Sequence, residues 1–476
     1  MNDVQRIAKN TGVYGLSQVI ASLLGFVLLI YLARYLGEVG FGKYSFALAF
    51  TSFFVIVADL GINQLIIREI SRDKELARVY LTNVVLIKLL LSIFAIAFIF
   101  LIINLMNYPP DTTYVVYLLG IYTILSSFIP AFMSMFQAFE RLEYTAIVTL
   151  IKEILLVSFI VYILSSGYGL IEVGYVYVFT GVIGLVLSFS ILLMRIAKPK
   201  PVIDLALWRK LIIGGTPFAL NALFAVFFFK IDTVMLSVLK GDAVVGIYNA
   251  AYNPLLALGT LVSGMLVAAI YPVMSRFYIS SRDALETTTI LASRYMALLG
   301  FPIAVGCFVL ADRFIELFYA GQYSASVLAF QILALFIPFR LVSHITGTLL
   351  TSINRQELRT VSVGVSALFN IFLNAFLIPY LSYIGAGIAT VLSEIFLYFI
   401  FLHYINKYYK KLVLYTHYTK PMIASILMGF FIFYFKNFNL LLLVLSASVV
   451  YFFLLIILKG FTEEDKNIVN QVLRMR

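Results

Sequence analysis

The chain has 476 residues and a formal net charge of +11; 62% of its residues are hydrophobic and only 12% are charged. So few charged residues cannot solvate the surface of a soluble protein of this length, and the composition therefore predicts an integral membrane protein. Cys307 is the only cysteine, which excludes an internal disulfide, and no Cys or His spacing is typical of a metal site. We expect no bound metal and no cofactor.

Apolar runs of about 20 to 28 residues follow one another along the chain. Such runs cross a hydrocarbon core of about 30 Å as tilted helices, whereas the strands of a membrane barrel would alternate over about 10 residues. The sequence therefore predicts an all-α membrane protein. In chain order, fourteen transmembrane helices are expected at about 11–35, 44–67, 79–104, 114–137, 144–166, 170–195, 210–233, 243–271, 288–311, 323–350, 360–380, 384–405, 420–436 and 439–459.

The Lys and Arg residues are divided unequally between the two sides of the membrane that these helices define. Of the 34, twenty-four lie on the side that carries both termini, five lie inside the expected helices, and five lie on the opposite side. By the positive-inside rule, both termini are predicted to be cytoplasmic in a multi-pass protein of the cell membrane. The basic loops thus indicate orientation and contact with anionic headgroups, and they do not indicate nucleic-acid binding.

A glycine-rich segment between the first two expected helices returns between the seventh and eighth. The segment "LGEVGFGKYSFA" begins at Leu36 and "KGDAVVGIYNAA" begins at Lys240. At one offset of 204 residues, the matched pairs are Gly37 and Gly241, Glu38 and Asp242, Gly42 and Gly246, Tyr44 and Tyr248, and Ala47 and Ala251. Glycines in such a segment permit a tight reversal between neighbouring helices.

Two shorter echoes follow in the same order. "FIP" at 128–130 recurs at 336–338, and "ERLE" at 140–143 is matched by "NRQE" at 354–357. Because six helices separate the copies, both halves have one orientation, as in the parallel repeats of secondary transporters. We expect two six-helix bundles around a central cleft, with two appended helices. The predicted domains are 1–197, a cytoplasmic linker at 198–210, 211–408, and a pair of helices with a tail at 409–476.

Three segments, "YLGEVGFGKYSFA", "ADLGINQLIIRE" and "FFFKIDTVMLSVLKGDAVVGIYNAAYN", resemble the polysaccharide-transporter branch of the multidrug/oligosaccharidyl-lipid/polysaccharide exporter superfamily. The resemblance extends over nearly the whole chain, including the layout of six, six and two helices. It implies a flippase, as O-antigen repeat-unit flippases are, which moves a polyprenyl-pyrophosphate-linked oligosaccharide from the cytoplasmic to the outer leaflet for surface polysaccharide biosynthesis. The glycan is not specified by these motifs.

Charged residues within membrane helices are costly, about 2.5 to 3.5 kcal/mol each on insertion scales, so they face a bundle interior, pair, or line a wet path. Cations in a low-dielectric cleft replace the lost hydration of a diphosphate, and Arg does so bidentately. The expected substrate-binding cations are Lys88, Lys152, Lys230 and Arg340.

Carboxylates at similar depth are candidates for coupling export to an H⁺ or Na⁺ gradient, because protonation changes a charge that the bilayer makes expensive. These residues are Asp59, Glu153, Asp232 and Glu394. Glu394 lies nearest the middle of its helix. Lys230 and Asp232 are two residues apart and point to opposite sides of one helix, so they are not expected to pair with each other.

Three alternatives stay open at this stage. The sister branch of multidrug and toxin exporters carries cations, which a cleft rich in Lys and Arg would oppose. A lipid-linked peptidoglycan precursor is carried on the same polyprenyl pyrophosphate as an oligosaccharide. A membrane-embedded enzyme acting on lipid-linked sugars would need a large outer loop with catalytic residues, and no GxxxxGK[ST] loop or such outer loop exists here. We expect no enzyme activity, a glycolipid substrate and a monomer.

Overall fold

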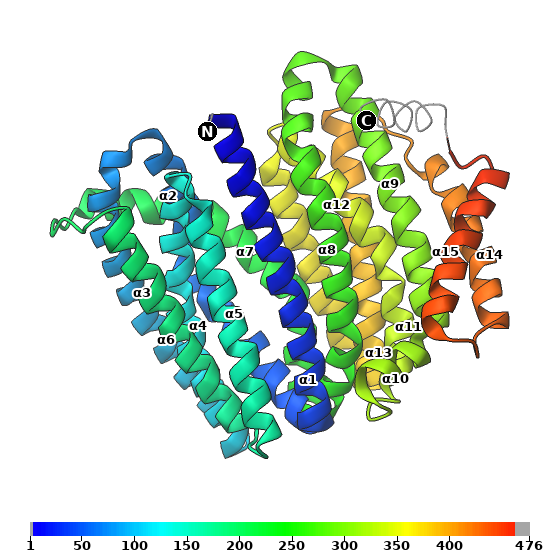
Figure 1. Cartoon of the computed structure of the whole chain (residues 1–476), viewed down its shortest axis with the longest axis horizontal. Coiled ribbons are helices and arrows are strands. Elements are labelled where there is room, and N and C mark those ends of the chain that lie inside the picture. Colours follow the sequence, from blue (N-terminus) through cyan, green and yellow to red (C-terminus); the bar gives the residue numbers. More distant parts are fainter. Residues whose placement is uncertain (1–2, 462–476) are drawn as a thin grey trace. The chain divides into compact units, whose positions relative to one another are not determined.

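The computed structural model describes residues 3–461, and within that range the chain forms helices and no strand (Figure 1). Eleven of the described helices are long and apolar enough to cross a membrane by length and composition, and Thr419–Tyr434 is a shorter apolar helix. The predicted all-α membrane fold is therefore confirmed. The basic tail residues Lys466, Arg474 and Arg476 lie outside the described residues.

The helices follow one another with short connections. In chain order they are α1 (Asp3–Asp59), α2 (Ile62–Arg72), α3 (Ala77–Leu105), α4 (Pro110–Ala138), α5 (Leu142–Ser165), α6 (Leu170–Arg195), α7 (Leu205–Lys240), α8 (Asp242–Ser280), α9 (Arg282–Val309), α10 (Ala311–Tyr319), α11 (Ser326–Ala334), α12 (Phe336–Ser352), α13 (Gln356–Tyr408), α14 (Thr419–Tyr434) and α15 (Leu440–Ile457), with 3₁₀ turns at Lys74–Leu76 and Tyr415–His417.

Two helices are much longer than one membrane crossing, because α1 has 57 residues and α13 has 53. At about 1.5 Å per residue, each would measure roughly 80 Å if it were straight. Each contains one non-helical residue, Gly37 (φ 66°, ψ −178°) in α1 and Ser382 (φ 54°, ψ −136°) in α13. Each long helix covers two of the predicted spans across its kink, so the structure does not establish the predicted count of fourteen.

The chain forms two compact units, Met1–Asn249 and Ala250–Arg476. Helices α1 to α7 lie in the first unit, α9 to α15 lie in the second, and α8 begins in the first and continues in the second. The first helix of the second sequence repeat, α7, belongs to the first unit because it packs on α1 and α2. Compact units and sequence repeats are thus different divisions of this chain, and the domain boundaries given above stay predictions.

Matched positions of the two repeats adopt matched backbone conformations. Gly37 and Gly241 both have positive φ (66° and 86°) with ψ near 180°. Glu140 and Asn354, which begin the "ERLE" and "NRQE" echoes, have φ values of 59° and 60°. In each echo the next residue, an arginine, donates its backbone N–H to the carbonyl five residues earlier, at 2.8 Å. Equal local geometry at matched sequence positions is what the predicted repeat requires.

The core of the first unit joins α2, α3, α4 and the start of α7. Ile66 and Ile70 of α2 pack with Leu81 of α3 and Phe136 of α4, and all four side chains are buried. Leu211 of α7 belongs to the same cluster. In the second unit, α12 packs on α9 and α13, while α14 packs on both α9 and α15 (Figure 1). The two appended helices are therefore attached to the second unit through α9.

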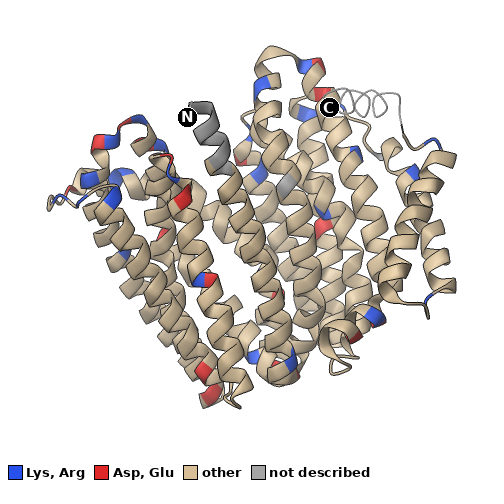
Figure 2. Ribbon diagram, in the orientation of Figure 1, with Lys and Arg blue, Asp and Glu red and all other residues tan. Residues whose placement is uncertain are grey.

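Helix ends carry the charges and the caps. Asp204 accepts a hydrogen bond from the backbone N–H of Leu207 at 3.0 Å and starts α7, and Ser281 caps α9 by accepting from Ala284 at 3.3 Å. Within each unit, Lys and Arg cluster near helix ends, as in the first unit around α2 and the start of α3 (Figure 2). The helix middles are almost free of charge, so the few charges found there are informative.

Candidate functional site

A polar cavity of about 420 Å³ lies inside the first unit, between α1, α2, α4 and α7. It exists because α1 stops at Asp59: the next two residues, Leu60 (φ 43°) and Gly61 (φ 70°), leave the helical conformation, and α2 restarts at Ile62. On the other side the wall is formed by small residues of α7. The polar lining residues are Ser52, Asp59, Asn63, Tyr122, Thr123, Ser126 and Ser127.

Asp59 faces this cavity, with Lys88 behind it. The Lys88 ammonium forms an ion pair with the Asp59 carboxylate and donates a hydrogen bond to the carbonyl oxygen of Ser127 at 2.8 Å. The Lys88 side chain is 0% exposed, whereas that of Asp59 is 23% exposed. Asn63, the second residue of α2, donates its amide N–H to Asp59 Oδ1 at 2.7 Å. The carboxylate is thus the accessible member of the pair.

A second ion pair is connected to the cavity through Tyr122. Lys152 and Glu153 of α5 pair at 3.0 Å, and Lys152 Nζ lies 3.4 Å from the Tyr122 hydroxyl. The ring of Tyr122 meets Tyr177 edge-on at 4.9 Å, and the hydroxyl of Tyr177 is hydrogen-bonded to that of Tyr44 at 2.5 Å. Tyr44 belongs to the first glycine-rich segment. A chain of contacts, polar except for the ring contact between Tyr122 and Tyr177, therefore runs from the cavity to the repeated turn.

The third predicted group lies on α7. Asp232 is buried and accepts a hydrogen bond from the hydroxyl of Tyr248, which is the repeat partner of Tyr44. Lys230 is half-buried and makes no ion pair within the described part of the chain. Their side chains point to opposite sides of α7 because two residues correspond to about 200° of helix. Lys230 and Asp232 consequently form no ion pair, although the charge of Asp232 still acts on the Lys230 ammonium.

The fourth predicted cation is paired inside the second unit. Arg340 of α12 donates to Glu394 of α13 at 3.0 Å and to the hydroxyl of Thr260 of α8 at 3.3 Å. The two charged side chains are only 6% and 4% exposed. A charge pair this deeply buried has lost most of its hydration, so each member depends on the other.

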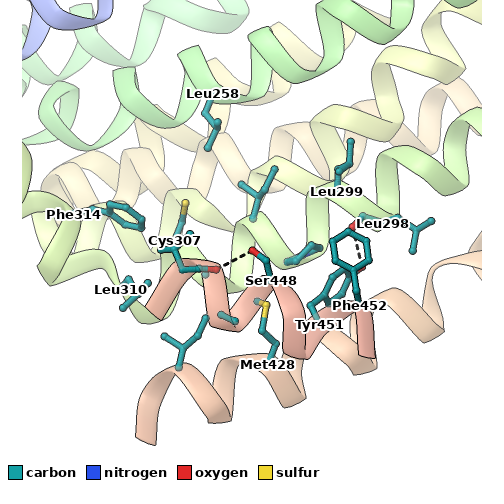
Figure 3. Close-up of a pocket in the computed structure, with 16 residues that line it drawn as sticks. Leu258, Leu298, Leu299, Cys307, Leu310, Phe314, Met428, Ser448, Tyr451 and Phe452 are labelled. Carbon is teal, nitrogen blue, oxygen red and sulfur yellow. Dashed lines mark hydrogen bonds between the residues drawn. The ribbon is translucent and has the colours of Figure 1, made fainter. Parts of the chain in front are cut away.

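An apolar cavity of about 320 Å³ lies elsewhere in the second unit, between α8, α9, α14 and α15 (Figure 3). Leu258, Cys307 and Met428 contribute to its wall, and the polar atoms of two other wall residues are already engaged. The Tyr451 hydroxyl donates to the Leu298 carbonyl at 2.8 Å, and that of Ser448 donates to the Val444 carbonyl at 2.9 Å. Such a lining suits a hydrocarbon chain and excludes a charged headgroup.

The sequence model of the family described as "Polysaccharide biosynthesis protein" matches residues 7–278, more than half of the chain. The chain belongs to this family. A second model, MatE, matches residues 217–376. The polysaccharide branch indicated by the glycine-rich segments is therefore confirmed as the family of this protein.

Several known proteins are similar to this family member over most of its length. The "Probable low-salt glycan biosynthesis flippase Agl15" of Haloferax volcanii is 22% identical over 425 residues, covering 89% of this chain and 88% of that protein. The inward closed lipid II flippase MurJ has a TM-score of 0.75 at 17% identity, covering 93% and 97%. An inward-facing multidrug resistance MATE transporter has a TM-score of 0.66 at 15% identity, covering 81% and 95%. At these identities the solved structures establish a common fold.

The tertiary structure of this family member pairs predicted cations with predicted carboxylates in three cases. The ion pairs are Asp59 with Lys88, Glu153 with Lys152, and Glu394 with Arg340. From the sequence, the cations were predicted to be substrate ligands and the carboxylates to be separate ion-coupling groups. Because three cations are neutralised, their presence alone is no longer an argument against a cationic substrate.

Several residues of the site were missed by the sequence analysis. Asn63, Tyr122 and Ser126 line the polar cavity, and none of them was nominated. The stretch "DLGIN" could have indicated Asn63, because in it two polar residues flank a glycine within an apolar run. No pattern singled out Tyr122 or Ser126 among the many aromatic and hydroxyl residues of the helices.

Proposed function

We propose that this protein is a flippase that carries a polyprenyl-pyrophosphate-linked oligosaccharide from the cytoplasmic to the outer leaflet. The observation that carries the proposal is membership of the polysaccharide biosynthesis family, joined to full-length similarity to a glycan biosynthesis flippase. The polar cavity beside α7, built from hydroxyl, amide and carboxylate groups, supports it. Those groups suit a sugar better than they suit an apolar drug.

The proposed mechanism is alternating access between two parallel repeats. The headgroup enters a cleft between the repeats from the cytoplasmic side while the polyprenyl tail stays in lipid, and outward rocking releases it. The excess of Lys and Arg on one side supports a cytoplasmic location of both termini in the cell membrane. Glu394 is proposed to couple the cycle to H⁺ or Na⁺, and a monomer is proposed because one chain contains both repeats.

Two other cargoes have specific support. A cation antiporter is favoured by the MatE match at 217–376 and by a polar cavity whose one charged wall residue among the described residues is Asp59. A lipid-linked peptidoglycan precursor is favoured by the structural similarity to MurJ. These cargoes differ in charge and in carrier, so one transport experiment separates them.

The experiment uses purified protein in liposomes. One set carries a fluorescent polyprenyl-pyrophosphate oligosaccharide in the inner leaflet, a second carries fluorescent lipid II there, and a third is loaded with ethidium. Appearance of each cargo outside is followed with and without a pH or Na⁺ gradient. Empty liposomes provide the background.

Oligosaccharide movement above background, with ethidium retained, is the expected result. Movement of lipid II alone would make the peptidoglycan precursor the cargo. Movement of ethidium alone would contradict the flippase and establish the cation antiporter. A rate that depends on one gradient identifies the coupling ion.

A further inference from the structure

We propose that the polar cavity of the first unit binds the neutral hydroxyl groups of the glycan, and that Lys230, one helical turn beyond it, binds the diphosphate. The inference rests on the proposed function and deepens it. It assigns the two chemical parts of one substrate to two neighbouring places along α7. Neither Asn63 nor Ser126, on which it depends, was among the predicted site residues.

The free polar atoms of the cavity are oxygens. Ser126 Oγ and Asn63 Oδ1 are buried atoms without a hydrogen-bond partner, and the Asp59 carboxylate lies beside them. Leaving such atoms unsatisfied costs about 1–3 kcal/mol each, so a ligand that supplies hydrogen-bond donors gains by entering. An anion supplies none and would leave Asn63 Oδ1 unsatisfied, whereas the Ser126 hydroxyl can either donate or accept. No Lys or Arg is among the described residues that line this cavity, so the diphosphate has no partner there.

The charge balance favours a neutral ligand over a cation. Lys88 already neutralises Asp59, so a second positive charge at the carboxylate would be repelled by a buried ammonium. The cavity of about 420 Å³ is also within the range of pockets for organic molecules and far larger than a single Na⁺ needs. A neutral polyhydroxyl group, as in a sugar ring, meets both conditions.

Tyr122 adds a surface on which a sugar can pack. Its ring lies in the cavity wall, held by Tyr177 on one side and by the Lys152 ammonium 5.9 Å from its centroid. Two contacts fix the orientation of this ring before any ligand arrives. A pre-positioned aromatic ring with a polar tip suits the apolar face of a sugar and its hydroxyl edge.

Lys230 continues the row of α7 residues that form the cavity wall. Ala219, Ala222 and Val226 line the cavity, and their spacing of three and four residues leads to Lys230. These four positions fall within roughly 80° of one face of the helix, and Lys230 is about 6 Å beyond Val226 along its axis. Among the four predicted cavity cations, Lys230 alone makes no ion pair in the described chain. The charge of Asp232 acts on it without a direct pair, so an anion can still form one with its ammonium.

The test compares two probes on the purified full-length protein in nanodiscs. The probes are undecaprenyl diphosphate and undecaprenyl diphosphate carrying N-acetylglucosamine, and dissociation constants are measured in Na⁺ buffer and in choline buffer. Ser126→Leu fills the cavity, and Lys230→Gln removes the free charge. Ser448→Leu in the apolar cavity of the second unit and Lys200→Gln in an exposed loop are the matched controls. Thermal melting checks that every variant is folded.

The wild type is expected to bind the sugar-bearing probe at least tenfold more tightly than the sugar-free probe. Ser126→Leu should weaken the sugar-bearing probe about tenfold and change the sugar-free probe less than twofold. Lys230→Gln should weaken both about tenfold, and the controls should change neither more than twofold. If Ser126→Leu unfolds the protein, Ser126→Ala replaces it, with an expected weakening of about threefold for the sugar-bearing probe only.

Three results would overturn the inference. They are equal binding of the two probes by the wild type, an equal effect of Ser126→Leu on both, and affinities unchanged by Lys230→Gln. A further result would also contradict the inference: probe binding that is tighter in Na⁺ buffer than in choline buffer, with this difference lost in Ser126→Leu. That result would make the cavity a cation site. If the wild type binds neither probe and moves ethidium, the proposed function fails as well. Glycolipid transport without this discrimination would remove only the inference.

Discussion

Gly42 and Gly246, which hold equivalent positions in the two repeats, are packed backbone to backbone across the start of α8. A Cβ atom on Gly42 would collide with the carbonyl group of Asp242, and one on Gly246 would collide with the carbonyl group of Glu38. The contact is reciprocal, since each glycine meets the residue four positions before the other glycine. Because backbone atoms fill both places, no side-chain rotation can relieve a substitution.

We predict that Gly42→Ala and Gly246→Ala each reduce glycolipid movement at least tenfold. Either methyl group forces the two repeated turns apart, and under alternating access these turns must open and close in each cycle. The control is Gly25→Ala, in the same helix as Gly42, where an added Cβ meets nothing within 4 Å. Liposome transport rates measure the effect, and rates equal to that of the Gly25 variant would show that the contact plays no part in the cycle.

The buried pair of Arg340 and Glu394 is expected to behave as one unit. Removing either charge alone, by Arg340→Met or Glu394→Met, leaves the other buried without its partner and should cost about 3–5 kcal/mol of stability. The double variant Arg340→Met with Glu394→Met should recover most of the loss. Thermal melting of the four proteins forms a double-mutant cycle. Additive losses in the double variant would contradict the coupling.

Transport by the double variant gives separate information. A stable double variant that no longer moves the glycolipid would place the pair in the transport cycle, as the sequence analysis proposed for both residues. A stable double variant with normal transport would confine the pair to a structural role. The measurement is informative only for the double variant, since the single variants change stability and charge together.

Asn83 is predicted to fix the position of the segment 198–210, which connects the two sequence repeats. It is fully buried in α3, donates to the carbonyl of Val202 at 2.9 Å, and accepts from the backbone N–H of Asp204 at 2.9 Å and from Trp208 Nε1 at 2.7 Å. Asn83→Leu should destabilise the first unit by about 2–4 kcal/mol, because several buried groups lose their partners.

The single tryptophan reports this change directly. Trp208 is the only tryptophan of the 476-residue chain, so its emission has no background from other sites. Loss of the indole hydrogen bond in Asn83→Leu is expected to shift the emission, and Thr82→Val, one residue away in α3, is the control. Thr82 donates only to the Lys200 carbonyl, at 2.7 Å. An unchanged spectrum and melting temperature in Asn83→Leu would contradict the prediction.

Gly429 is expected to determine how closely α14 packs on α9. A Cβ at this position would lie 2.6 Å from Val305 Cγ1, which is too close for any real contact. Gly429→Val should therefore displace the appended helices and lower stability by about 1–3 kcal/mol. Gly306→Ala is the control, because Gly306 lies in the facing helix and has nothing within 4 Å. Equal melting temperatures for both variants would contradict this packing argument.

Much of the fold was readable from local patterns. Apolar runs of membrane length predicted the helices, and the repeated segments predicted that Gly37 and Gly241 would have equivalent roles. Both glycines adopt the positive φ that a helix reversal needs. The break inside α13 at Ser382 falls between the predicted spans 360–380 and 384–405, whereas the break at Leu60 and Gly61 lies inside the predicted span 44–67 and was not expected.

The sequence by itself determined that this protein crosses a membrane, is built from a parallel repeat and belongs to the polysaccharide biosynthesis family. Only the tertiary structure decided which charges meet, since Asp59 and Lys88 are 29 residues apart and Arg340 and Glu394 are 54 apart. The physical reason is that helices which are apolar on every side carry little information about which face turns inward. That rotation, fixed by packing against neighbouring helices, leaves Lys230 without an ion pair and places Ser126 in a cavity wall.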